Sequence, residues 1–309
     1  MSRPLRIAIA GLGKIARDQH MPAIAGNPDF QLAAIISSTA QDEAVPVFRT
    51  LEDVLASGLH LDAIAICTPP QVRHALCDLA SANGLAVLLE KPPATTVEEA
   101  RALAAMGQDR GTTVFAGWHS RFAPFVADAR VWCENHGVLH GQIDWHEDPA
   151  KWHPGQAWLW QNGGLGVFDP GINALSILTA IRPGAWCLWG ARFEQPENAE
   201  TPSAARFSLG RNEDRVEVSL SFAAGDTETW SIRLEAGNGE TLHLLDGGTA
   251  LSLNGGVAAR RPNAEYAGIY KRFAGLIAAG QSEVDVVPLD LVEAAFLTAD
   301  ITPVGPVAV

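Results

Sequence analysis

Apolar residues follow two different patterns along the chain, and the first 120 residues show continuous runs. These runs cover residues 6–10, 32–36, 62–67, 86–89 and 113–116. Segments with helical patterning separate them, such as residues 71–83 and the stretch that Thr96 opens as an N-cap. Short apolar runs that alternate with helices are typical of a parallel sheet with both faces covered. The pattern predicts an α/β domain over residues 1–120.

The later part of the chain shows alternation instead. Polar and apolar residues alternate at 215–220 and 230–234, turn signals occur at 238–239 and 246–248, and helical patterning returns at 264–279 and 289–300. Period-two runs joined by Asn-Gly and Asp-Gly turns are typical of antiparallel hairpins with one exposed face. We therefore expect residues 121–309 to form a second, α+β domain with an open, mostly antiparallel sheet.

The composition is that of an ordinary globular protein, with 309 residues of which 47% are hydrophobic. A formal net charge of −13, without a block of Lys or Arg, argues against nucleic acid and anionic membranes as partners. The four cysteines show no C-x-x-C pairing, which suits buried thiols in a reducing compartment. The apolar runs are too short for a membrane span or a secretory signal. We expect a cytoplasmic protein.

A glycine-rich turn lies directly after the first apolar run. Gly11-Leu12-Gly13-Lys14-Ile15-Ala16 is a G-x-G-x-x-A motif between a predicted strand and a predicted helix. In that context Gly11 permits the tight turn, Gly13 lets a pyrophosphate approach the backbone, and Ala16 permits close helix packing. Amides at the helix N-terminus would then hold the phosphates. The context favours a dinucleotide site over an ordinary glycine turn.

Residues that end the other strands extend this site, because ligands of open α/β sheets bind outside the carboxyl ends of the strands. The candidate cofactor-binding residues are Gly11, Gly13, Lys14, Ile15, Ser37, Ser38, Thr68, Pro69, Glu90 and Lys91. An NAD-selective site would carry Asp or Glu where this chain has Ser37 and Ser38. Hydroxyls suit a ribose 2′-hydroxyl or a 2′-phosphate, so we expect use of both NAD and NADP, unless the two serines merely end the strand.

Two further segments carry candidate catalytic residues. Lys91 follows the apolar run 86–89, at the carboxyl end of a predicted parallel strand, where a nicotinamide ring should lie. Residues 163–173 form a glycine-rich segment that ends in Asp169-Pro170-Gly171-Ile172-Asn173. Asp169 and Asn173 are four residues apart and would face the same side of a helix start. An N-capping role is the alternative for these two residues.

Together, the opening G-x-G-x-x-A, the Glu-Lys-Pro around Lys91 and the glycine-rich segment with Asp169 resemble the Gfo/Idh/MocA family of sugar and polyol dehydrogenases. The resemblance covers essentially the whole chain. It implies a Rossmann domain followed by a domain whose open sheet covers the nicotinamide and carries the substrate. It also makes a homodimer possible, because open sheets in such families often pair face to face.

The chain departs from the family pattern at one position. The common pattern D-x-G-x-H ends in a histidine that often serves as acid or base, and this chain has Asn173 there. An amide carries no proton at neutral pH, so another group must act as the base. Asp169 is the first candidate. Lys91 is the second, because a lysine beside a positively charged nicotinamide would lose its proton more readily.

Other segments resemble one branch of that family, the bacterial D-galactose and L-arabinose 1-dehydrogenases. They are K-I-A-R-D-Q-H at 14–20, W-H-S-R at 118–121 and W-H-P-G-Q at 152–156. The resemblance implies oxidation of the anomeric carbon of D-galactose to a lactone with NAD(P) as hydride acceptor. L-Arabinose shares the configuration at C2, C3 and C4, so the similarity does not separate the two sugars. Oxidation of another ring hydroxyl, as in inositol, is a further alternative.

Six of the nine tryptophans fall between residues 118 and 160, among several histidines and carboxylates. Indole faces suit the CH faces of a pyranose, and carboxylates and imidazoles bind its hydroxyls. The candidate substrate-binding residues are Lys91, His119, Glu147, Trp152, His153, Asp169, Asn173 and Trp230. The alternative is a structural tryptophan cluster with surface carboxylates. The histidine spacing matches no metal-ligand pattern, so we expect no metal.

Overall fold

The computed structural model describes residues 3–40, 44–152, 155–222 and 228–307. They form two compact units. Unit 1 comprises residues 1–119 and 265–286, and unit 2 comprises residues 120–264 and 287–309. This division differs from the predicted one because residues 265–286 belong to the first unit.

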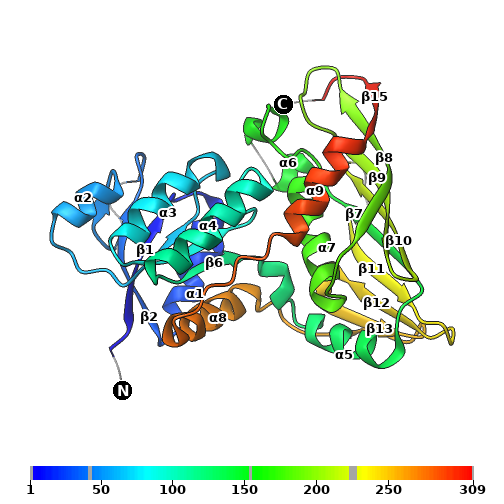
Figure 1. The fold of residues 1–309 in the computed structure, drawn as a ribbon, viewed down its shortest axis with the longest axis horizontal. Helices are drawn as coiled ribbons and strands as arrows, with labels where there is room; N and C mark the ends of the chain where they lie inside the picture. Colours follow the sequence, from blue (N-terminus) through cyan, green and yellow to red (C-terminus); the bar gives the residue numbers. More distant parts are fainter. Residues whose placement is uncertain (1–2, 41–43, 153–154, 223–227, 308–309) are drawn as a thin grey trace. The chain divides into compact units, whose positions relative to one another are not determined.

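The sheet of unit 1 is parallel and has six strands, in the order β3-β2-β1-β4-β5-β6 (Figure 1). The strands are β1 (Leu5–Ala10), β2 (Phe30–Ile36), β3 (Val47–Phe48), β4 (Ala63–Ile66), β5 (Ala86–Glu90) and β6 (Val114–Gly117). Every residue of β4, β5 and β6 is buried, which explains their continuous apolar sequence. The strand order reverses between β1 and β4, and the carboxyl ends of these strands flank the crevice where such sheets bind ligands. The predicted parallel α/β fold is confirmed.

Helices flank both faces of this sheet (Figure 1). They are η1 (Ala16–His20), α1 (Met21–Ala25), α2 (Leu51–Ala56), η2 (Pro70–Val72), α3 (Arg73–Ala82), α4 (Val97–Arg110) and α8 (Glu265–Ala279). The Thr96 side chain caps α4 by accepting a hydrogen bond from Glu99 N, as predicted. The segment η1, directly after the glycine turn, is a π-helical turn. Such turns are rare and often mark functional sites.

Helix α8 returns to unit 1 from far along the sequence. It packs on α1, and its Phe273 ring stacks on Phe30 at 5.7 Å between centroids. After it, Glu283 exchanges two backbone hydrogen bonds with β6, to Val114 and Ala116. The helical periodicity of residues 264–279 predicts a helix with an apolar face, but a local pattern does not say which sheet that face covers.

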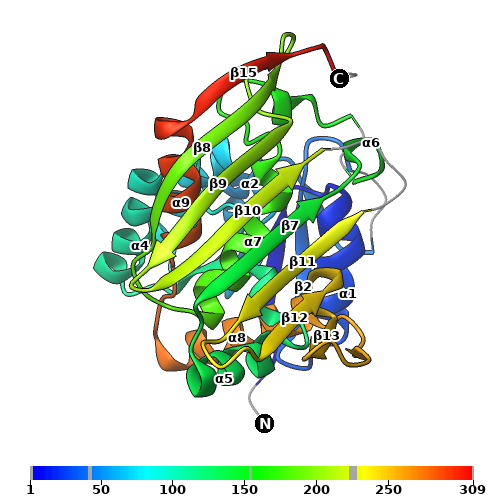
Figure 2. The same ribbon diagram turned by 90° about the vertical axis from the view of Figure 1, so that its right-hand side faces the viewer.

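The sheet of unit 2 has nine strands, in the order β14-β13-β12-β11-β7-β10-β9-β8-β15 (Figure 2). They are β7 (His140–His146), β8 (Cys187–Pro196), β9 (Ala204–Arg211), β10 (Asp214–Ser221), β11 (Thr229–Glu235), β12 (Thr241–Leu245), β13 (Ala250–Leu253), β14 (Ala259–Arg260) and β15 (Asp300–Val304). The pairs β7–β10 and β8–β15 are parallel and the other pairs are antiparallel. The predicted open, mostly antiparallel sheet is confirmed.

Helices cover one face of this sheet. They are α5 (Val126–His136), α7 (Phe168–Ile181) and α9 (Val287–Thr298), which contact β12, β7 and β8 respectively. Shorter helical segments are η3 (His119–Phe122), α6 (Pro149–Trp152), η4 (Ala157–Trp160) and η5 (Asp246–Gly248). In β10 the residues Val216, Val218 and Leu220 are buried and their neighbours are more exposed. One face is therefore packed and the other solvated, as the alternating sequence predicts.

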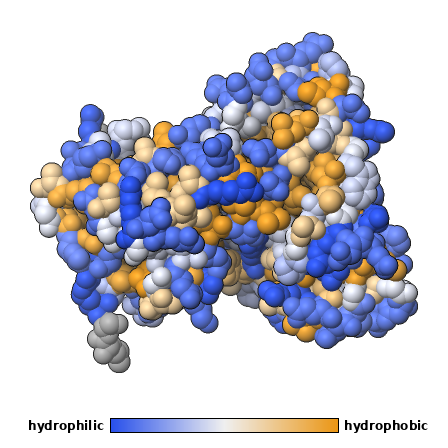
Figure 3. All heavy atoms as spheres, in the orientation of Figure 1, coloured by the Kyte–Doolittle hydropathy of each residue, from blue (hydrophilic) through white to orange (hydrophobic). Residues whose placement is uncertain are grey.

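Hydrophilic and hydrophobic residues are interspersed over the face of the molecule drawn in Figure 3. Among the described residues, none of the helices is both long and apolar enough to cross a membrane.

Candidate active site

The glycine turn after β1 has the geometry of a dinucleotide site. Gly11 has φ +89°, and a Cβ on it would lie 2.9 Å from Thr68 N, so a larger residue does not fit. A Cβ on Gly13 would meet no atom within 4 Å. The Thr68 hydroxyl at the end of β4 is buried and has no hydrogen-bond partner among the described residues. Open space beside the backbone and a buried hydroxyl without a partner both fit a bound dinucleotide.

The other predicted cofactor residues around this turn lie at strand and helix ends. Lys14 forms an exposed ion pair with Asp18, and Ile15 is 37% exposed. Ser37 follows β2, and its hydroxyl accepts hydrogen bonds from Thr39 N and Ala40 N at 3.3 and 3.2 Å. This local turn already uses part of the hydrogen-bonding capacity of the Ser37 side chain.

Glu90, directly before Lys91, lies inside unit 1 and is 5% exposed. Its Oε1 atom is 2.8 Å from His20 Nε2 and accepts a hydrogen bond from Tyr266 Oη at 2.7 Å. Its Oε2 atom accepts one from Lys91 N at 3.0 Å. His20 Nδ1 in turn lies 2.8 Å from Tyr270 Oη. Sequence analysis expects Glu90 to bind the cofactor, but the structure engages its carboxylate in this interior network.

The network pairs a buried carboxylate with a buried imidazole. Burial alone would raise the pKa of Glu90, but the hydrogen bond and charge of His20 hold that pKa well below its usual value. Burial alone would lower the pKa of His20, but Cys67, Tyr270 and Glu90 raise it well above its usual value. Burial also raises the pKa of Tyr270 to about 12. Both ring nitrogens of His20 thus lie within hydrogen-bond distance of a partner, Nε2 near Glu90 and Nδ1 near Tyr270.

A buried arginine fixes the main chain on the other side of Lys91. Arg73, the first residue of α3, is 4% exposed. It donates from Nε to Thr68 O at 2.8 Å and from Nη1 to the carbonyls of Glu90 and Pro92. It thus joins the turns that follow β4 and β5, which contain the predicted residues Thr68, Pro69 and Lys91.

His119 is the last residue of the first chain segment of unit 1, and it contacts this network through Tyr266. Its Nδ1 is 2.9 Å from Glu265 Oε2, and its ring stacks on Tyr266 with 5.3 Å between centroids. The side chain is 14% exposed. His119 is therefore oriented by the first turn of α8, and its use as a sugar ligand stays a prediction.

In unit 2, Asp169 and Asn173 lie one turn apart in α7, as their spacing predicts. The N-cap of α7 is Val167, so neither residue has the N-capping role considered as the alternative. Asp169 is 5% exposed and Asn173 is partly buried. A Cβ on Gly171 would lie 2.5 Å from Leu220 Cδ1, so this glycine lets α7 approach β10 closely.

A second group of predicted residues lies around the ends of β7 and β11. Glu147 is 6% exposed and accepts a hydrogen bond from Trp230 Nε1 at 3.2 Å. Trp152 meets Trp230 edge to face, with 5.4 Å between centroids. Trp152 Nε1 and Lys151 Nζ both contact the Glu228 carboxylate at 2.5 Å. His153 lies outside the described residues.

The structure thus places the predicted site residues in two groups, one in each unit. Residues that the sequence patterns do not indicate support these groups, namely His20, Arg73, Glu228, Tyr266 and Tyr270. The sequence does give a signal for His20, because it belongs to the segment 14–20 that resembles the D-galactose and L-arabinose 1-dehydrogenases. Arg73 and the two tyrosines act through contacts that a local pattern does not reveal.

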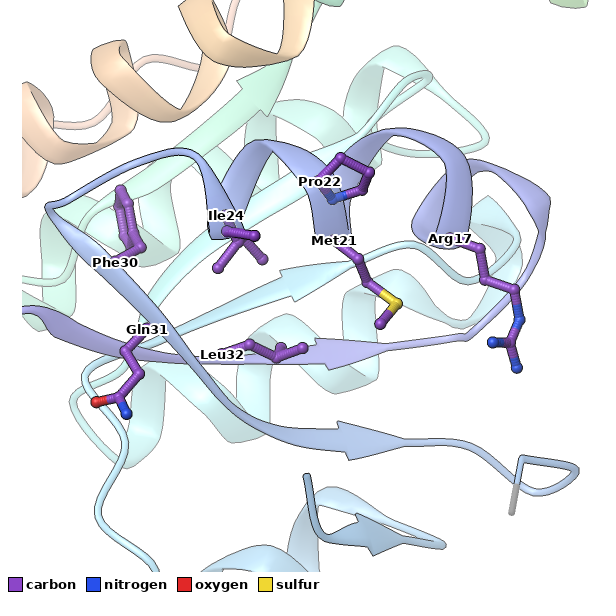
Figure 4. A pocket seen from close by; sticks show the side chains of 8 residues that line it. Arg17, Met21, Pro22, Ile24, Phe30, Gln31 and Leu32 are labelled. Carbon is purple, nitrogen blue, oxygen red and sulfur yellow. The ribbon is translucent and has the colours of Figure 1, made fainter. Parts of the chain in front are cut away.

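A hollow in unit 1 lies elsewhere (Figure 4). It has a volume of about 520 Å³ and is lined by residues of η1, α1 and the first half of β2. Phe30 and Leu32 lie near the amino end of β2, whereas dinucleotides bind at carboxyl ends. We therefore do not assign this hollow to the cofactor.

Comparison with known proteins gives the chain a family. Residues 5–118 match the Gfo/Idh/MocA oxidoreductases, described as an oxidoreductase family with an NAD-binding Rossmann fold. The chain is 42% identical to a galactose 1-dehydrogenase of Pseudomonas fluorescens over 297 residues, which cover 95% of both proteins. The chain belongs to the Gfo/Idh/MocA family. The predicted family, the oxidoreductase class and the nicotinamide dinucleotide cofactor are thereby confirmed.

Solved structures agree with this assignment. The structure of a D-galactose 1-dehydrogenase from Rhizobium etli matches with a TM-score of 0.94 and 39% identity, covering 100% of this chain and 99% of that one. A 3-ketoreductase from Actinomadura kijaniata matches with a TM-score of 0.81 over 97% and 99% of the two chains. Its identity is 18%, so it supports the fold alone.

Proposed function

We propose that the protein is an aldose 1-dehydrogenase that oxidises the anomeric carbon of D-galactose to galactonolactone with NAD or NADP. The similarity to the Pseudomonas fluorescens enzyme, at 42% identity over 95% of both chains, carries this proposal. The geometry of the two groups of site residues supports it. One group suits a dinucleotide, and the other places carboxylates beside indoles, which suits a sugar.

Residues of unit 1 would hold the cofactor. Gly11 and Gly13 leave the turn open to the pyrophosphate, and the buried Thr68 hydroxyl is available as a hydrogen-bonding group. Residues 36–40 contain no acidic side chain that would repel a 2′-phosphate, which supports use of NADP beside NAD. When bound, the nicotinamide supplies the acceptor for the hydride that leaves C1.

The chain's own groups manage the proton and charge on O1. Asp169 takes the proton of the O1 hydroxyl while C1 becomes a carbonyl carbon, and the product is the lactone. The Lys91 ammonium stabilises the negative charge that develops on O1. Asn173, one turn after Asp169, donates its amide N–H to the same oxygen. Because Asn173 cannot accept the proton, the base is Asp169 in this proposal.

The group in unit 2 would recognise the ring together with His119 of unit 1. Trp152 and Trp230 present indole surface to the sugar CH groups, while Glu147 and His119 form hydrogen bonds with its hydroxyls. Glu228 fixes Trp152 through its indole N–H. The Lys151 ammonium also lies 4.8 Å from the centre of the Trp152 ring.

We also propose that the enzyme works in the cytoplasm. Cys67, Cys77, Cys133 and Cys187 are free thiols, which is typical of reducing compartments.

The test is a set of initial rates of NAD and NADP reduction with D-galactose, L-arabinose, D-fucose, D-glucose and myo-inositol. We expect high kcat/KM for D-galactose, little for D-glucose, and a lactone that hydrolyses to an acid. Equal or higher kcat/KM for L-arabinose would reassign the substrate to the pentose. A ketose product, or no reduction with any aldose, would overturn the proposal.

A further inference from the structure

The main chain around Lys91 is held by two buried side chains, that of the preceding residue Glu90 and that of Arg73 from the start of α3. The Glu90 carboxylate accepts the hydrogen bond of the Lys91 amide, and Arg73 donates to the carbonyls of Glu90 and Pro92. A lysine side chain is long and flexible, so fixing its backbone limits the volume that its ammonium can reach. The positions of Glu90 and Arg73 are therefore relevant to what Lys91 does.

Glu90 is itself held by side chains from two other segments. His20, the last residue of the π-helical turn η1, and Tyr266, in the first turn of α8, both contact Oε1 at 2.7–2.8 Å. Oε2 remains for the Lys91 amide at 3.0 Å. The two oxygens thus have separate tasks, and the partners of Oε1 determine how the carboxylate is oriented.

The geometry of α8 suits this arrangement. Tyr266 and Tyr270 are four residues apart and present their hydroxyls to the same interior site. Tyr266 donates to Glu90, and Tyr270 lies 2.8 Å from the second nitrogen of His20. The rings of His20 and Tyr266 meet edge to face at 5.0 Å, and those of His20 and Tyr270 at 5.8 Å. Each polar atom of His20 therefore has a partner, although the side chain is only 1% exposed.

A buried carboxylate beside a buried imidazole is rarely the most stable way to fill a protein interior. Well-packed apolar residues often give equal or greater stability, because both polar groups must lose their hydration. Unit 1 nevertheless places His20 against Glu90, the residue directly before the candidate catalytic lysine. The pair therefore calls for an explanation other than stability, and its link to the Lys91 amide provides one.

We propose that His20 and Tyr266 are positioning residues for Lys91, which orient the Glu90 carboxylate so that it holds the Lys91 main chain in place for the reaction. This inference rests on the proposed function only in giving Lys91 its role at O1. It also explains why α8 belongs to unit 1: the helix carries two of the hydroxyls that complete the network.

The first test measures the Lys91 amide directly, without sugar or cofactor. Hydrogen–deuterium exchange is followed for a peptide that contains residues 89–93, in which Pro92 and Pro93 have no amide hydrogen. Y266F removes one donor to Glu90, and H20Q keeps a donor but removes the charge. We expect exchange at Lys91 to become at least about 10-fold faster in H20Q and Y266F. Unchanged exchange in both variants would overturn the proposal.

The second test separates positioning from general damage. We expect kcat with D-galactose to fall about 10-fold in Y266F and H20Q and further in H20A, while the Kd for NADPH by fluorescence changes less than about 2-fold. S282A is the matched control, because Ser282 bonds to Val114 N and Thr112 O in the same unit. S282A should keep the wild-type kcat. An equal fall of kcat in S282A, or an equal kcat in H20Q and H20A, would overturn the proposal.

The two proposals fail in different ways. If the wild-type protein oxidises no aldose, the proposed function fails while the exchange rates still test the positioning of Lys91. If the wild-type protein is active and the variants keep both its exchange rate and its kcat, only the positioning fails.

Discussion

The two units hold their buried carboxylates in different surroundings. Glu90 in unit 1 and Glu147 in unit 2 are 5% and 6% exposed, so the degree of burial does not distinguish them. Glu90 faces the imidazole of His20 together with a tyrosine hydroxyl and a backbone amide. Glu147 accepts a hydrogen bond from the neutral indole N–H of Trp230.

This difference indicates different roles for the two units. In unit 1 the contact between His20 and Glu90 holds the Lys91 main chain in one position. In unit 2 the Glu147 carboxylate accepts a hydrogen bond from Trp230, whose ring meets the partly exposed ring of Trp152. Such partly exposed rings suit contact with a ligand. We therefore propose that unit 1 supplies orientation and fixed charge, and that unit 2 supplies the base and most of the sugar contacts.

The largest expected effect belongs to Asp169, the proposed base in unit 2. D169N keeps the shape of the side chain but removes its ability to take a proton. We expect kcat to fall by about 10³-fold, because a positioned base contributes about 10²–10⁴. A variant that retains most of its activity would move the base to another group, with Lys91 the next candidate.

The next effect is on stability and contrasts the two carboxylates directly. E90Q leaves the buried His20 without its charged partner, and breaking such pairs costs about 3–5 kcal/mol. E147Q keeps an amide oxygen that can accept the weaker, neutral hydrogen bond from Trp230, so it costs about 1 kcal/mol or less. Scanning calorimetry should show a melting temperature lower by about 6 °C or more for E90Q and by about 2–4 °C for E147Q. Equal shifts would remove the distinction between the two sites.

Lys91 tests whether unit 1 supplies charge to the reaction. K91A should lower kcat for D-galactose about 10²-fold, because it removes an electrostatic group at the developing oxyanion. The KM for D-galactose should change much less. If K91A raises only KM, the lysine binds the sugar and does not stabilise the charge on O1.

Trp230 tests recognition in unit 2. W230F keeps a ring but loses the hydrogen bond to Glu147, whose carboxylate would then be held less firmly. We expect KM for D-galactose to rise about 10-fold, equivalent to about 1.4 kcal/mol, with kcat nearly unchanged. W189F is the control, because Trp189 lies on β8 and is 42% exposed. Equal kinetics for W230F and the wild type would exclude Trp230 from the sugar site.

The sequence predicts unit 1 better than unit 2, and the reason is the range of the contacts. The strands β1, β4, β5 and β6 are buried on both faces, so their own residues reveal them. Strand β7 lies between β10 and β11, although about 70 residues separate it from β10 in the chain. Its sequence, HGQIDWH, has four polar or charged residues on the more exposed side and does not indicate a central strand.

The candidate site shows the same limit. Gly11, Gly13 and Lys91 follow predicted strands directly, so the rule about carboxyl ends of parallel strands locates them. The partners of Glu90 come from residues 20, 266 and 270, and local periodicity carries no information about such distant contacts. Because these partners lie so far apart in the sequence, the boundary predicted at residue 120 leaves α8 out of the first unit.

The smallest expected effect concerns the Asp62 carboxylate at the edge of unit 1. It tests whether a charge also stabilises the folded state where it is less buried than Glu90. Asp62 accepts two hydrogen bonds from the Arg3 guanidinium, at 2.7 and 2.8 Å, and one from Arg6 N at 2.7 Å. The bonds from Arg3 lower the pKa of Asp62 to about 2, against about 3.9 in an unfolded chain. The stabilisation is therefore complete above about pH 4 and disappears as the pH falls toward 2. Because Arg3 is 57% exposed, solvent screening limits this stabilisation to about 1 kcal/mol or less.

D62N should be slightly less stable than the wild type at pH 7, and urea unfolding at decreasing pH should show this difference shrinking below pH 4. A difference that stays constant over this range would mean that Asp62 acts through packing and not through its charge.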